Sequence, residues 1–325
     1  MIGKNFYYQE KKMIATVTLN PSLDMILKLN RLKLNQYNIV KRVTRIPGGK
    51  GINISKAVRV YGLETMALGF LGGHNSHYIA EQLRQYSITT NFWHIEEETR
   101  ENVIIIEENN NTHTLLSEPG PEITEHDLDH FKSIFFRVMA QSKVVALSGS
   151  LPSKVPDDIY FQLIELAHQR NVLTILDATG TAFDKGLQAK PFLARPDLRA
   201  TGYRFFNKKI NSQESALEIA QEIIKHGVKI AIVSLGDNKD VIVTEEGAWL
   251  AESAADNFVN IVGRDESIIA GFAIKITSEE KEQMADIIQF AMACGLASSL
   301  TDSEVFHSRD DITACLPSIK VTELK

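Results

Sequence analysis

Hydrophobic residues along the chain gather in short, nearly continuous runs rich in Val, Ile, Leu and Ala. Runs of this kind are typical of strands covered on both faces of a sheet, where no position needs to meet water. We expect such strands at residues 13–19, 64–72, 143–150, 172–180, 191–196 and 229–236. A sheet that carries helices on both faces follows from this pattern.

The stretches between these runs have the pattern of amphipathic helices. We expect helices at 51–61, 76–86, 125–139, 157–170 and 215–226, and further helices at 279–300 and 309–316. Strands that alternate with helices predict an α/β fold with a doubly wound, mostly parallel sheet. Ligands of such folds bind at the carboxyl ends of the strands.

Two segments, Met25–Ile46 and Glu101–Glu118, instead alternate polar and apolar residues at period two. They predict a small antiparallel sheet outside the main layer, with a hairpin turn at Asn109–Asn111. Because they flank polar motifs, we interpret them as a β-lid over the ligand crevice, and we expect a homodimer through the lid. A flap without a role in binding is the alternative. Residues 13–325 are predicted to form one domain, and residues 1–12 an extension outside the core.

The composition narrows the class of protein. The chain has 325 residues, 44% of them hydrophobic, and a formal net charge of −6. No basic cluster stands out, which argues against a nucleic-acid partner, and no apolar run is long enough to cross a membrane. The polar first residues do not form a secretory signal. Cys294 and Cys315 both lie in helical patterns, so we expect reduced, buried thiols and a cytoplasmic location.

Two polar motifs lie close to the first predicted strand. "NPSLD" places Asp24 just beyond that strand, where its carboxylate could accept hydrogen bonds from two sugar hydroxyls. Taken alone, the motif fits an Asx turn or a helix cap equally well. "PGGKGIN" combines glycines that permit close backbone approach, including Gly49, with the cation of Lys50 and with Asn53 in the first turn of a helix. This combination suits a phosphorylated ligand.

A third motif, "NIVGRDESIIAGF", predicts a tight turn at Gly263 that leads into a helix opening at Ser267. The free N–H groups and the dipole of a helix N-terminus attract anions. This turn nevertheless carries Arg264, Asp265 and Glu266, three charges where an anion would meet bare backbone. Either these residues take part in phosphate chemistry, or the two acids only cap the helix, where acidic residues are favoured.

Together the motifs resemble the ribokinase-like (PfkB-type) sugar kinases, and most of all the branch of 1-phosphofructokinase and tagatose-6-phosphate kinase. In chain order they are "TLNPSLD", "GGKGIN", "TREN", "EPGPEI", "SGSLP" with "VPDDIY", "SLG" and "NIVG…S…AGF". The resemblance covers nearly the whole chain from Met13 onward. It implies an α/β sandwich with a β-lid, ATP and Mg²⁺, and transfer of the γ-phosphate to a hydroxyl of a sugar phosphate. Fructose 1-phosphate, fructose 6-phosphate and tagatose 6-phosphate are not distinguished.

The residues that the resemblance assigns to the sugar are all present. Asp24 would hold sugar hydroxyls, and Gly49, Lys50 and Asn53 would contact the sugar phosphate and ring. Arg100, in "TREN" on the lid, would clamp the phosphate, a task that suits the bidentate guanidinium group.

The nucleotide side departs from the family pattern. The family turn Gly-Ala-Gly-Asp is here Gly263-Arg264-Asp265-Glu266, so the base position falls on Glu266 and the second glycine on Asp265. The remaining positions implied for the nucleotide are Asp197, Ser234 and Gly236. Three further segments on the nucleotide side depart from the family pattern. Arg195-Pro196-Asp197 lacks the Glu that follows in the family, because Leu198, Arg199 and Ala200 come next. Asp237-Asn238-Lys239-Asp240 replaces a Gly-rich turn, and Asp302-Ser303-Glu304 replaces Gly-Thr-Gly.

Two hypotheses follow. The first is an ATP-dependent sugar-phosphate kinase with altered and slowed chemistry, in which Glu266 or Asp265 is the base and Arg264 offsets charge on the transferred group beside Gly263. The second is a sugar-phosphate-binding or regulatory relative that has lost efficient transfer. Asp265 puts a carboxylate at the mouth of the anion hole, where it repels the γ-phosphate unless Mg²⁺ or Arg264 neutralises it.

Overall fold

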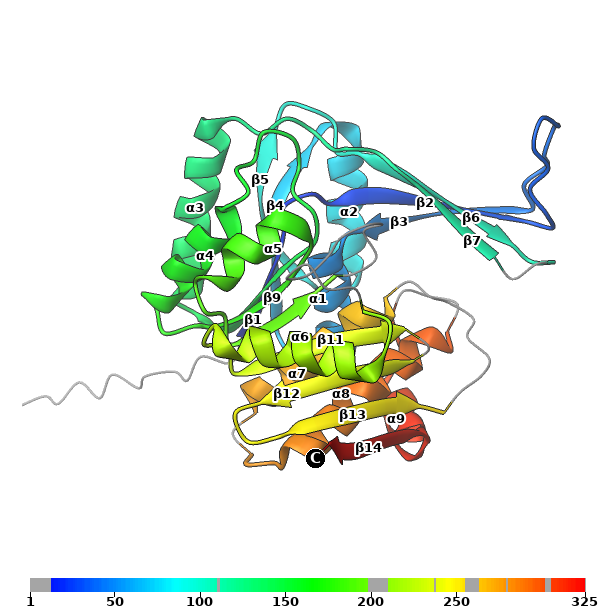
Figure 1. Cartoon of the computed structure of the whole chain (residues 1–325). Coiled ribbons are helices and arrows are strands. Elements are labelled where there is room, and N and C mark those ends of the chain that lie inside the picture. Colours follow the sequence, from blue (N-terminus) through cyan, green and yellow to red (C-terminus); the bar gives the residue numbers. More distant parts are fainter. Residues whose placement is uncertain are drawn as a thin grey trace, which may run out of the picture.

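The computed structural model describes residues 13–109, 112–197, 210–236, 238–254, 263–278, 280–301 and 305–324. These residues form an α/β body built on a large sheet, and a smaller sheet extends from one side of the body (Figure 1). The predicted fold class, a large and mostly parallel sheet with helices on both faces and a second small sheet, is confirmed.

The large sheet has ten strands: β1 (Met13–Thr18), β4 (Thr65–Gly72), β5 (Thr89–Ile95), β8 (Ser142–Ser148), β9 (Leu173–Ala178), β10 (Leu193–Pro196), β11 (Ile230–Gly236), β12 (Lys239–Thr244), β13 (Ala248–Ser253) and β14 (Ile319–Leu324). Their order is β14-β13-β12-β11-β10-β9-β8-β1-β4-β5. All neighbours from β11 to β5 pair in parallel. Strands β12, β13 and β14 extend the other edge in antiparallel order.

Helices cover both faces of this sheet. One face packs against α3 (Glu125–Met139), α4 (Ile159–His168), α5 (Gly180–Leu187) and α6 (Gln213–Lys225). The other packs against α1 (Lys50–Tyr61), α7 (Arg264–Thr277), α8 (Met284–Ser299) and α9 (Arg309–Cys315), which a short 3₁₀ turn, η1 (Leu316–Ser318), joins to β14. Successive residues of β1 divide between the two cores, because side chains alternate along a strand: Ile14 lies in one and Ala15 in the other.

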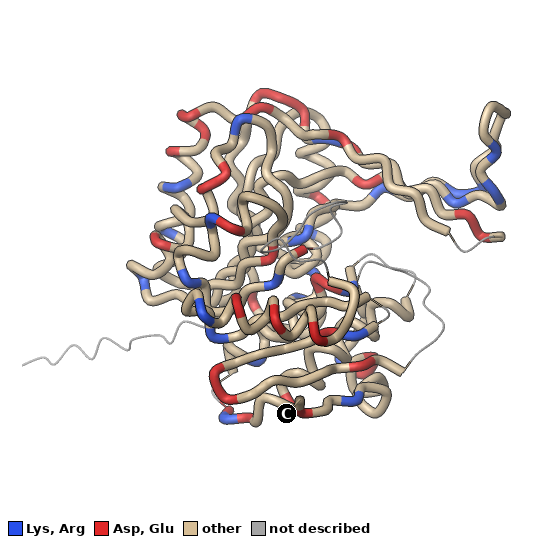
Figure 2. Tube along the Cα trace, in the orientation of Figure 1, with Lys and Arg blue, Asp and Glu red and all other residues tan. Residues whose placement is uncertain are grey.

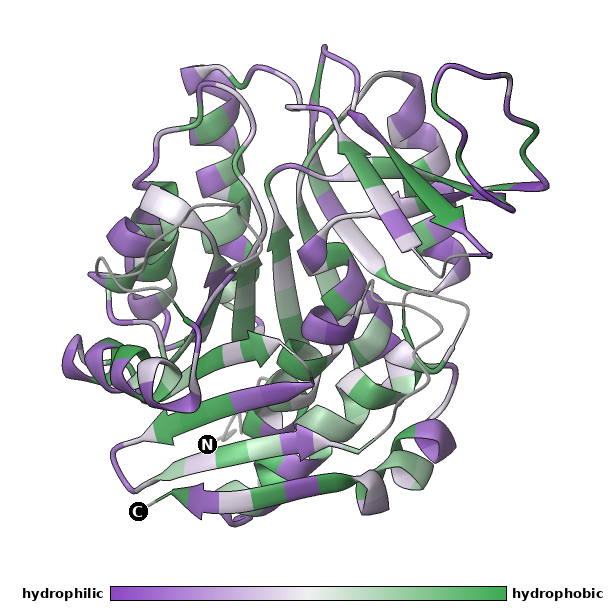
Figure 3. Cartoon of the chain, turned by 45° about the vertical axis from the view of Figure 1, so that its right-hand side comes forward, coloured by the Kyte–Doolittle hydropathy of each residue, from purple (hydrophilic) through white to green (hydrophobic). Residues whose placement is uncertain are grey.

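The distribution of polarity follows from these layers. The strands of the large sheet are mainly hydrophobic in Figure 3, and the helices outside them are mixed, with hydrophilic stretches. Acidic and basic residues are interspersed along the trace (Figure 2). None of the described helices is long and apolar enough to cross a membrane. Cys294 and Cys315 are both buried and free, as the sequence predicted.

The smaller sheet consists of β3 (Arg42–Gly48), β2 (Ser22–Leu29), β6 (Glu101–Glu107) and β7 (Thr112–Ser117), in that spatial order. The pairs β2–β3 and β6–β7 are antiparallel as predicted, but the central pair β2–β6 is parallel. Helix α2 (Gly73–Gln85) and the β2 residue Leu23 share a third cluster that joins this sheet to the body. Residues 30–41, predicted as part of a strand segment, form a long connection that projects away from the body (Figure 1).

Several boundaries differ from the predictions. Helix α7 begins at Arg264, not Ser267, because Gly263 alone makes the turn, with the left-handed φ of 89° that glycine adopts readily. The charged triplet that we had placed in the turn is therefore the first turn of a helix. Residues 1–12, 198–200, 302–304, Asp237 and the predicted hairpin tip at 110–111 lie outside the described residues.

Candidate functional site

A cavity of about 400 Å³ opens between the smaller sheet and the carboxyl ends of the central strands. It is lined by Thr18, Asn20, Ser22, Asp24, Gly49, Lys50, Asn53, Arg100, Asn102, Leu115, Ser117, Gly149, Ser150, Ala178, Thr179, Asp197 and Glu266. All five residues that we predicted on the sugar side are among them. The position agrees with the rule that ligands of α/β folds bind at the carboxyl ends of strands, and we call this space the sugar-side cavity.

Asp24 lies in β2, on the side of this cavity that the smaller sheet forms. Its Oδ1 accepts hydrogen bonds from the Ser22 hydroxyl at 2.7 Å and from Asn102 Nδ2 at 2.8 Å. These partners leave Oδ2 for a ligand. Burial raises the pKa of Asp24, although both hydrogen bonds and the positive charges of Lys56 and Arg100 act in the opposite direction. A buried carboxylate with one oxygen directed to a polar cavity is suited to accept hydrogen bonds from sugar hydroxyls.

Arg100 precedes β6 and is held by residues at the end of β7 and just after β1. Its guanidinium donates to the backbone oxygens of Asn20 and Glu118, both at 2.9 Å, and to the Ser117 hydroxyl at 2.9 Å. Burial lowers its pKa, and the charge of Asp24 opposes that effect. The arginine is therefore fixed at the rim of the cavity before any ligand arrives.

The glycine turn before α1 lets backbone come very close to the site. Gly49 has a φ of 117°, and an added Cβ would lie 2.6 Å from the Thr18 methyl group. A Cβ on Gly48 would lie 2.2 Å from Asp24 Oδ2. Lys56 holds this turn in place, because its completely buried ammonium group donates a hydrogen bond to the Pro47 carbonyl at 2.8 Å. Glycine is required here because any side chain would fill the space around the Asp24 carboxylate.

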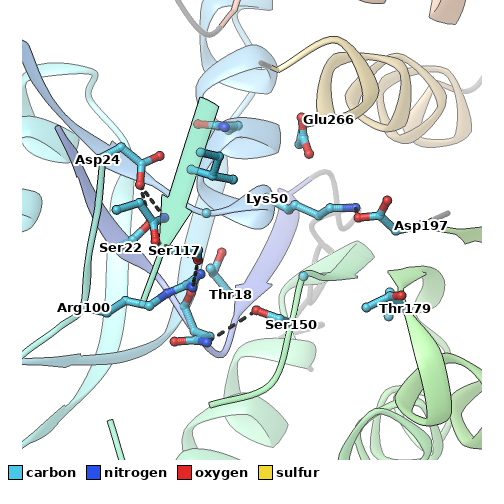
Figure 4. Close-up of a pocket in the computed structure, with 17 residues that line it drawn as sticks. Thr18, Ser22, Asp24, Lys50, Arg100, Ser117, Ser150, Thr179, Asp197 and Glu266 are labelled. Atoms are coloured by element: carbon cyan, nitrogen blue, oxygen red, sulfur yellow. Dashed lines mark hydrogen bonds and ion pairs between the residues drawn. The ribbon is translucent and has the colours of Figure 1, made fainter. Parts of the chain in front are cut away.

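Lys50, the first residue of α1, reaches across the cavity. Its ammonium group lies 3.0 Å from an oxygen of Asp177 and 2.8 Å from Asp197 Oδ2. Figure 4 shows this side chain extending toward Asp197, whereas Arg100 lies with Asp24 and Ser22 on the opposite side. The two cations predicted to contact the sugar phosphate thus lie on different sides of the cavity.

Four buried oxygen atoms of the lining have no hydrogen-bond partner among the described residues: Thr18 Oγ1, Asn20 Oδ1, Asn53 Oδ1 and Thr179 Oγ1. Leaving a buried polar atom unpaired costs on the order of 1–3 kcal/mol. Their presence around one cavity indicates a ligand rich in hydroxyl groups or other donors.

Asp265 and Glu266, which are adjacent in the first turn of α7, line two different cavities. Glu266 is 3% exposed and lines the sugar-side cavity, toward which its carboxylate points in Figure 4. Asp265 lines a second cavity of about 250 Å³ with Arg195, Pro196, Asp197, Ile210, Ser234, Leu235 and Gly236. We call this the nucleotide-side cavity, because it contains the three residues predicted for the nucleotide. Asp197 lines both cavities, so the two spaces meet there.

Asp265 is paired with two arginines. Its carboxylate lies 2.8 Å from Arg195 Nη2 and 3.2 Å from Arg264 Nη1. Arg264 also pairs with the fully buried Asp240 at 2.7 Å. The repulsion that we expected from Asp265 is therefore neutralised within the chain, by Arg264 as the sequence analysis allowed and also by Arg195.

The described residues beside the nucleotide-side cavity offer hydrogen-bond donors for an anion, but they form no ready cluster for a resident metal ion. Two arginines and the start of α7 place hydrogen-bond donors for an anion beside the nucleotide-side cavity. Among the described residues, no group of three His, Cys, Asp or Glu could hold a metal. That is compatible with Mg²⁺, which proteins commonly bind through one or two carboxylates together with substrate phosphates. Asp197 is the carboxylate between the cavities, although it pairs with Lys50 here.

Sequence reasoning missed several residues of the site. Asn102 and Ser22 lie in motifs that we singled out, and both hold Asp24. Asp177 lies near the carboxyl end of a strand that we predicted and is completely buried between Lys50 and Arg195. A lone acid at the carboxyl end of an otherwise apolar strand is a signal that could have identified Asp177.

Comparison with known proteins agrees with this geometry. The model of the pfkB family carbohydrate kinases matches residues 17–303. A 1-phosphofructokinase of Bacillus subtilis is 32% identical over 312 residues, which are 96% of this chain and 100% of the relative. A tagatose-6-phosphate kinase of Staphylococcus epidermidis is 29% identical over 315 residues, again 96% and 100% of the two chains. The crystal structure of a possible 1-phosphofructokinase from Thermotoga maritima matches with a TM-score of 0.90 and 29% identity, covering 96% of this chain and 100% of that one. This chain therefore belongs to the pfkB family of carbohydrate kinases.

Proposed function

We propose that the protein is an ATP-dependent sugar-phosphate kinase that transfers the γ-phosphate to a hydroxyl of a ketohexose phosphate. The observation that carries the proposal is the placement of Asp24 and Glu266 on one polar cavity that meets a second, arginine-bearing cavity at Asp197. Two similar proteins, a 1-phosphofructokinase and a tagatose-6-phosphate kinase, support this substrate class.

In this proposal Asp24 orients the sugar and Glu266 is the general base. Asp24 accepts hydrogen bonds from two hydroxyls, and Glu266 accepts the proton of the hydroxyl that attacks. A bond forms between that oxygen and the γ-phosphorus, the bond from the γ-phosphorus to the ADP oxygen breaks, and the proton ends on Glu266. Glu266 is favoured over Asp265 as the base because it lines the sugar-side cavity, whereas Asp265 is engaged by two arginines on the other side.

The cations have separate tasks. Arg100, fixed at the lid rim, is placed to bind the phosphate of the sugar. Lys50, between Asp177 and Asp197, is placed near the junction of the cavities, where negative charge develops during transfer. When bound with ATP, Mg²⁺ supplies charge neutralisation of the phosphates. Asp197 is the residue that would help to hold it.

A second candidate function is a sugar-phosphate-binding or regulatory protein without efficient transfer. The observation that favours it is the carboxylate of Asp265 between Arg195 and Arg264, on the side where the nucleotide phosphates would bind. The sugar-side cavity carries no comparable obstruction among its described residues. The two functions therefore predict the same sugar binding and differ in turnover.

We further propose that the protein is cytoplasmic and forms a homodimer through the smaller sheet. Large apolar side chains are exposed on that sheet and its connections: Leu34 (79%), Tyr37 (90%), Ile39 (78%), Leu115 (61%) and Leu116 (55%). Exposed apolar groups of this kind mark interaction surfaces. Light scattering on the purified chain tests this proposal, and a monomeric mass at micromolar concentration would refute the dimer.

ADP release measured over a panel of sugar phosphates, with calorimetry of the same ligands, tests the function. The kinase requires ADP release that depends on one of fructose 1-phosphate, fructose 6-phosphate or tagatose 6-phosphate. Tight sugar-phosphate binding without ADP release would favour the binding protein instead. An absence of binding to every sugar phosphate would contradict both.

A further inference from the structure

Two arginines hold the Asp265 carboxylate in an arrangement that also suits a phosphate group. Arg195 Nη2 approaches Oδ2 at 2.8 Å, and Arg264 Nη1 approaches Oδ1 at 3.2 Å. Each oxygen of Asp265 is therefore bound by a different guanidinium group. Arginine binds carboxylate and phosphate oxygens through the same pattern of donors, so one anion can replace the other.

Both arginines have other anchors, so they would stay in place if the Asp265 carboxylate moved away. Arg195 is 2% exposed and also lies 3.3 Å from Asp177 Oδ1. Arg264 is bound to the buried Asp240 at 2.7 Å. Donors that are already fixed lose little freedom when they bind a ligand.

Arg195 has a donor that the described residues leave unused. Its Nε atom is buried and has no hydrogen-bond partner among them. The residue lines the nucleotide-side cavity together with Asp265, Ser234 and Gly236. Buried donors of a charged group are rarely left unpaired, because their desolvation is then not offset. This N–H group therefore indicates an acceptor that enters the cavity from outside.

The backbone of the first turn of α7 attracts anions as well. Asp265 is in the first turn of α7, which follows Gly263 and has no side-chain cap. The positive end of the helix dipole and its free N–H groups favour negative charge there. The Asp265 carboxylate thus occupies a place where two cations and a helix N-terminus converge.

We propose that Asp265 is an internal counter-anion, which keeps Arg195 and Arg264 in place in the ligand-free chain and is displaced by a phosphate group of the nucleotide. The inference rests on the proposed function, because it assigns the incoming phosphate to the ATP of the kinase. A phosphate carries more charge than a carboxylate and offers an additional oxygen, which can accept from Arg195 Nε. Displacing Asp265 costs free energy, so the nucleotide binds more weakly than the arginines alone would allow.

The charges of the ion-pair network around Asp265 indicate which substitution should strengthen anion binding. Contacts among the described residues join three cations to four carboxylates. The members are Lys50, Arg195 and Arg264 with Asp177, Asp197, Asp240 and Asp265. Replacing Asp265 with asparagine removes one negative charge, which is the competing anion, while it keeps the size of the side chain.

Calorimetric titration of Asp265→Asn with ADP and with inorganic tripolyphosphate tests the proposal. We expect both anions to bind at least tenfold more tightly than to the wild-type chain. Glu245→Gln is the matched control, because it removes the same charge from an exposed pair with Lys229 at 2.8 Å, and it should change neither affinity. Equal or weaker binding of both anions by a folded Asp265→Asn variant would overturn the proposal.

A second measurement needs no change at Asp265. In the wild-type chain with ¹⁵N-labelled arginine, the Nε–H resonance of Arg195, assigned through Arg195→Lys, should shift when tripolyphosphate saturates the protein. An unchanged resonance would overturn the proposal. Failure of the proposed function is recognised separately: a chain that releases no ADP with any sugar phosphate but shows both anion effects is not a kinase, yet still has this displaceable carboxylate.

Discussion

Replacing Asp24 with asparagine should weaken sugar-phosphate binding and, at neutral pH, make the folded chain more stable. Burial raises the pKa of this carboxyl group above its ordinary value of 3.8, and the hydrogen bonds from Ser22 and Asn102 only partly offset that effect. The ionised form is therefore held in the folded chain at a cost. A neutral asparagine does not carry that cost.

The sign of the pH dependence follows from the raised pKa. Between the unfolded and the folded pKa, the folded chain binds more protons, so its stability falls as pH rises through that window. The advantage of Asp24→Asn should be largest above the folded pKa and should vanish below about pH 3.8, where both states of the wild-type carboxyl group are protonated. Each unit by which the pKa is raised contributes about 1.4 kcal/mol.

The loss of binding can be worked from the contacts. Asparagine keeps an oxygen that can accept from Ser22 and Asn102, which lie at 2.7 and 2.8 Å, so the site should keep its shape. It loses the charged acceptor that faces the cavity. A hydrogen bond to a charged group contributes about 1.5–3 kcal/mol, and its loss corresponds to roughly a 10- to 100-fold increase in Kd.

Calorimetry with fructose 1-phosphate and tagatose 6-phosphate measures the binding, and thermal unfolding between pH 3 and pH 8 measures the stability. Asp157→Asn is a suitable control, because this exposed carboxylate lies 3.9 Å from Lys185, outside the residues that line either cavity. Wild-type affinity in Asp24→Asn would refute the role in sugar binding. A lower Tm than the wild type at pH 7 would refute the argument from burial.

Two further substitutions test the cations of the sugar-side cavity. Lys50→Ala should slow ADP release at saturating sugar phosphate about tenfold, because it removes the cation at the junction of the cavities, and should lower the Tm, because the buried Asp177 then keeps only Arg195 as a cation among its described ion pairs; an unchanged rate of ADP release would reject the assignment. Arg100→Ala should raise the KM for the sugar phosphate about tenfold and leave the affinity for ATP unaltered, since its contacts lie on the lid side. A fall in ATP affinity instead would move this arginine to the nucleotide site.

The central strands of the large sheet could be predicted from the sequence, whereas its outer strands could not. Strands β1, β4, β8, β9, β10 and β11 are covered on both faces, so their sequences are continuous apolar runs. The outer strand β13 is mostly half-exposed, and its sequence, "AWLAES", has no comparable run. The parallel pairing of β2 with β6 was also missed, because register between distant segments is a tertiary property.

At the site, the sequence identified residues but not their partners. Asp24 and Asn53 were found from local motifs and Arg100 from the family resemblance, and the structure places all three on one cavity. Which of Asp265 and Glu266 faces the sugar side and serves as the base was left open, because that depends on where α7 begins. Successive residues of a helix point about 100° apart, so a helix that begins at Arg264 directs these neighbours to different cavities.

Turnover of Glu266→Gln, measured beside its sugar-phosphate affinity, tests the central claim most directly. A neutral amide of the same size cannot accept the hydroxyl proton. We predict ADP release at least about 1,000-fold slower than in the wild-type chain, with a Kd for the sugar phosphate within about threefold of the wild type. Brisk ADP release by Glu266→Gln would contradict the assignment of the base. A wild-type chain that binds the sugar phosphate but releases no ADP would contradict the kinase itself.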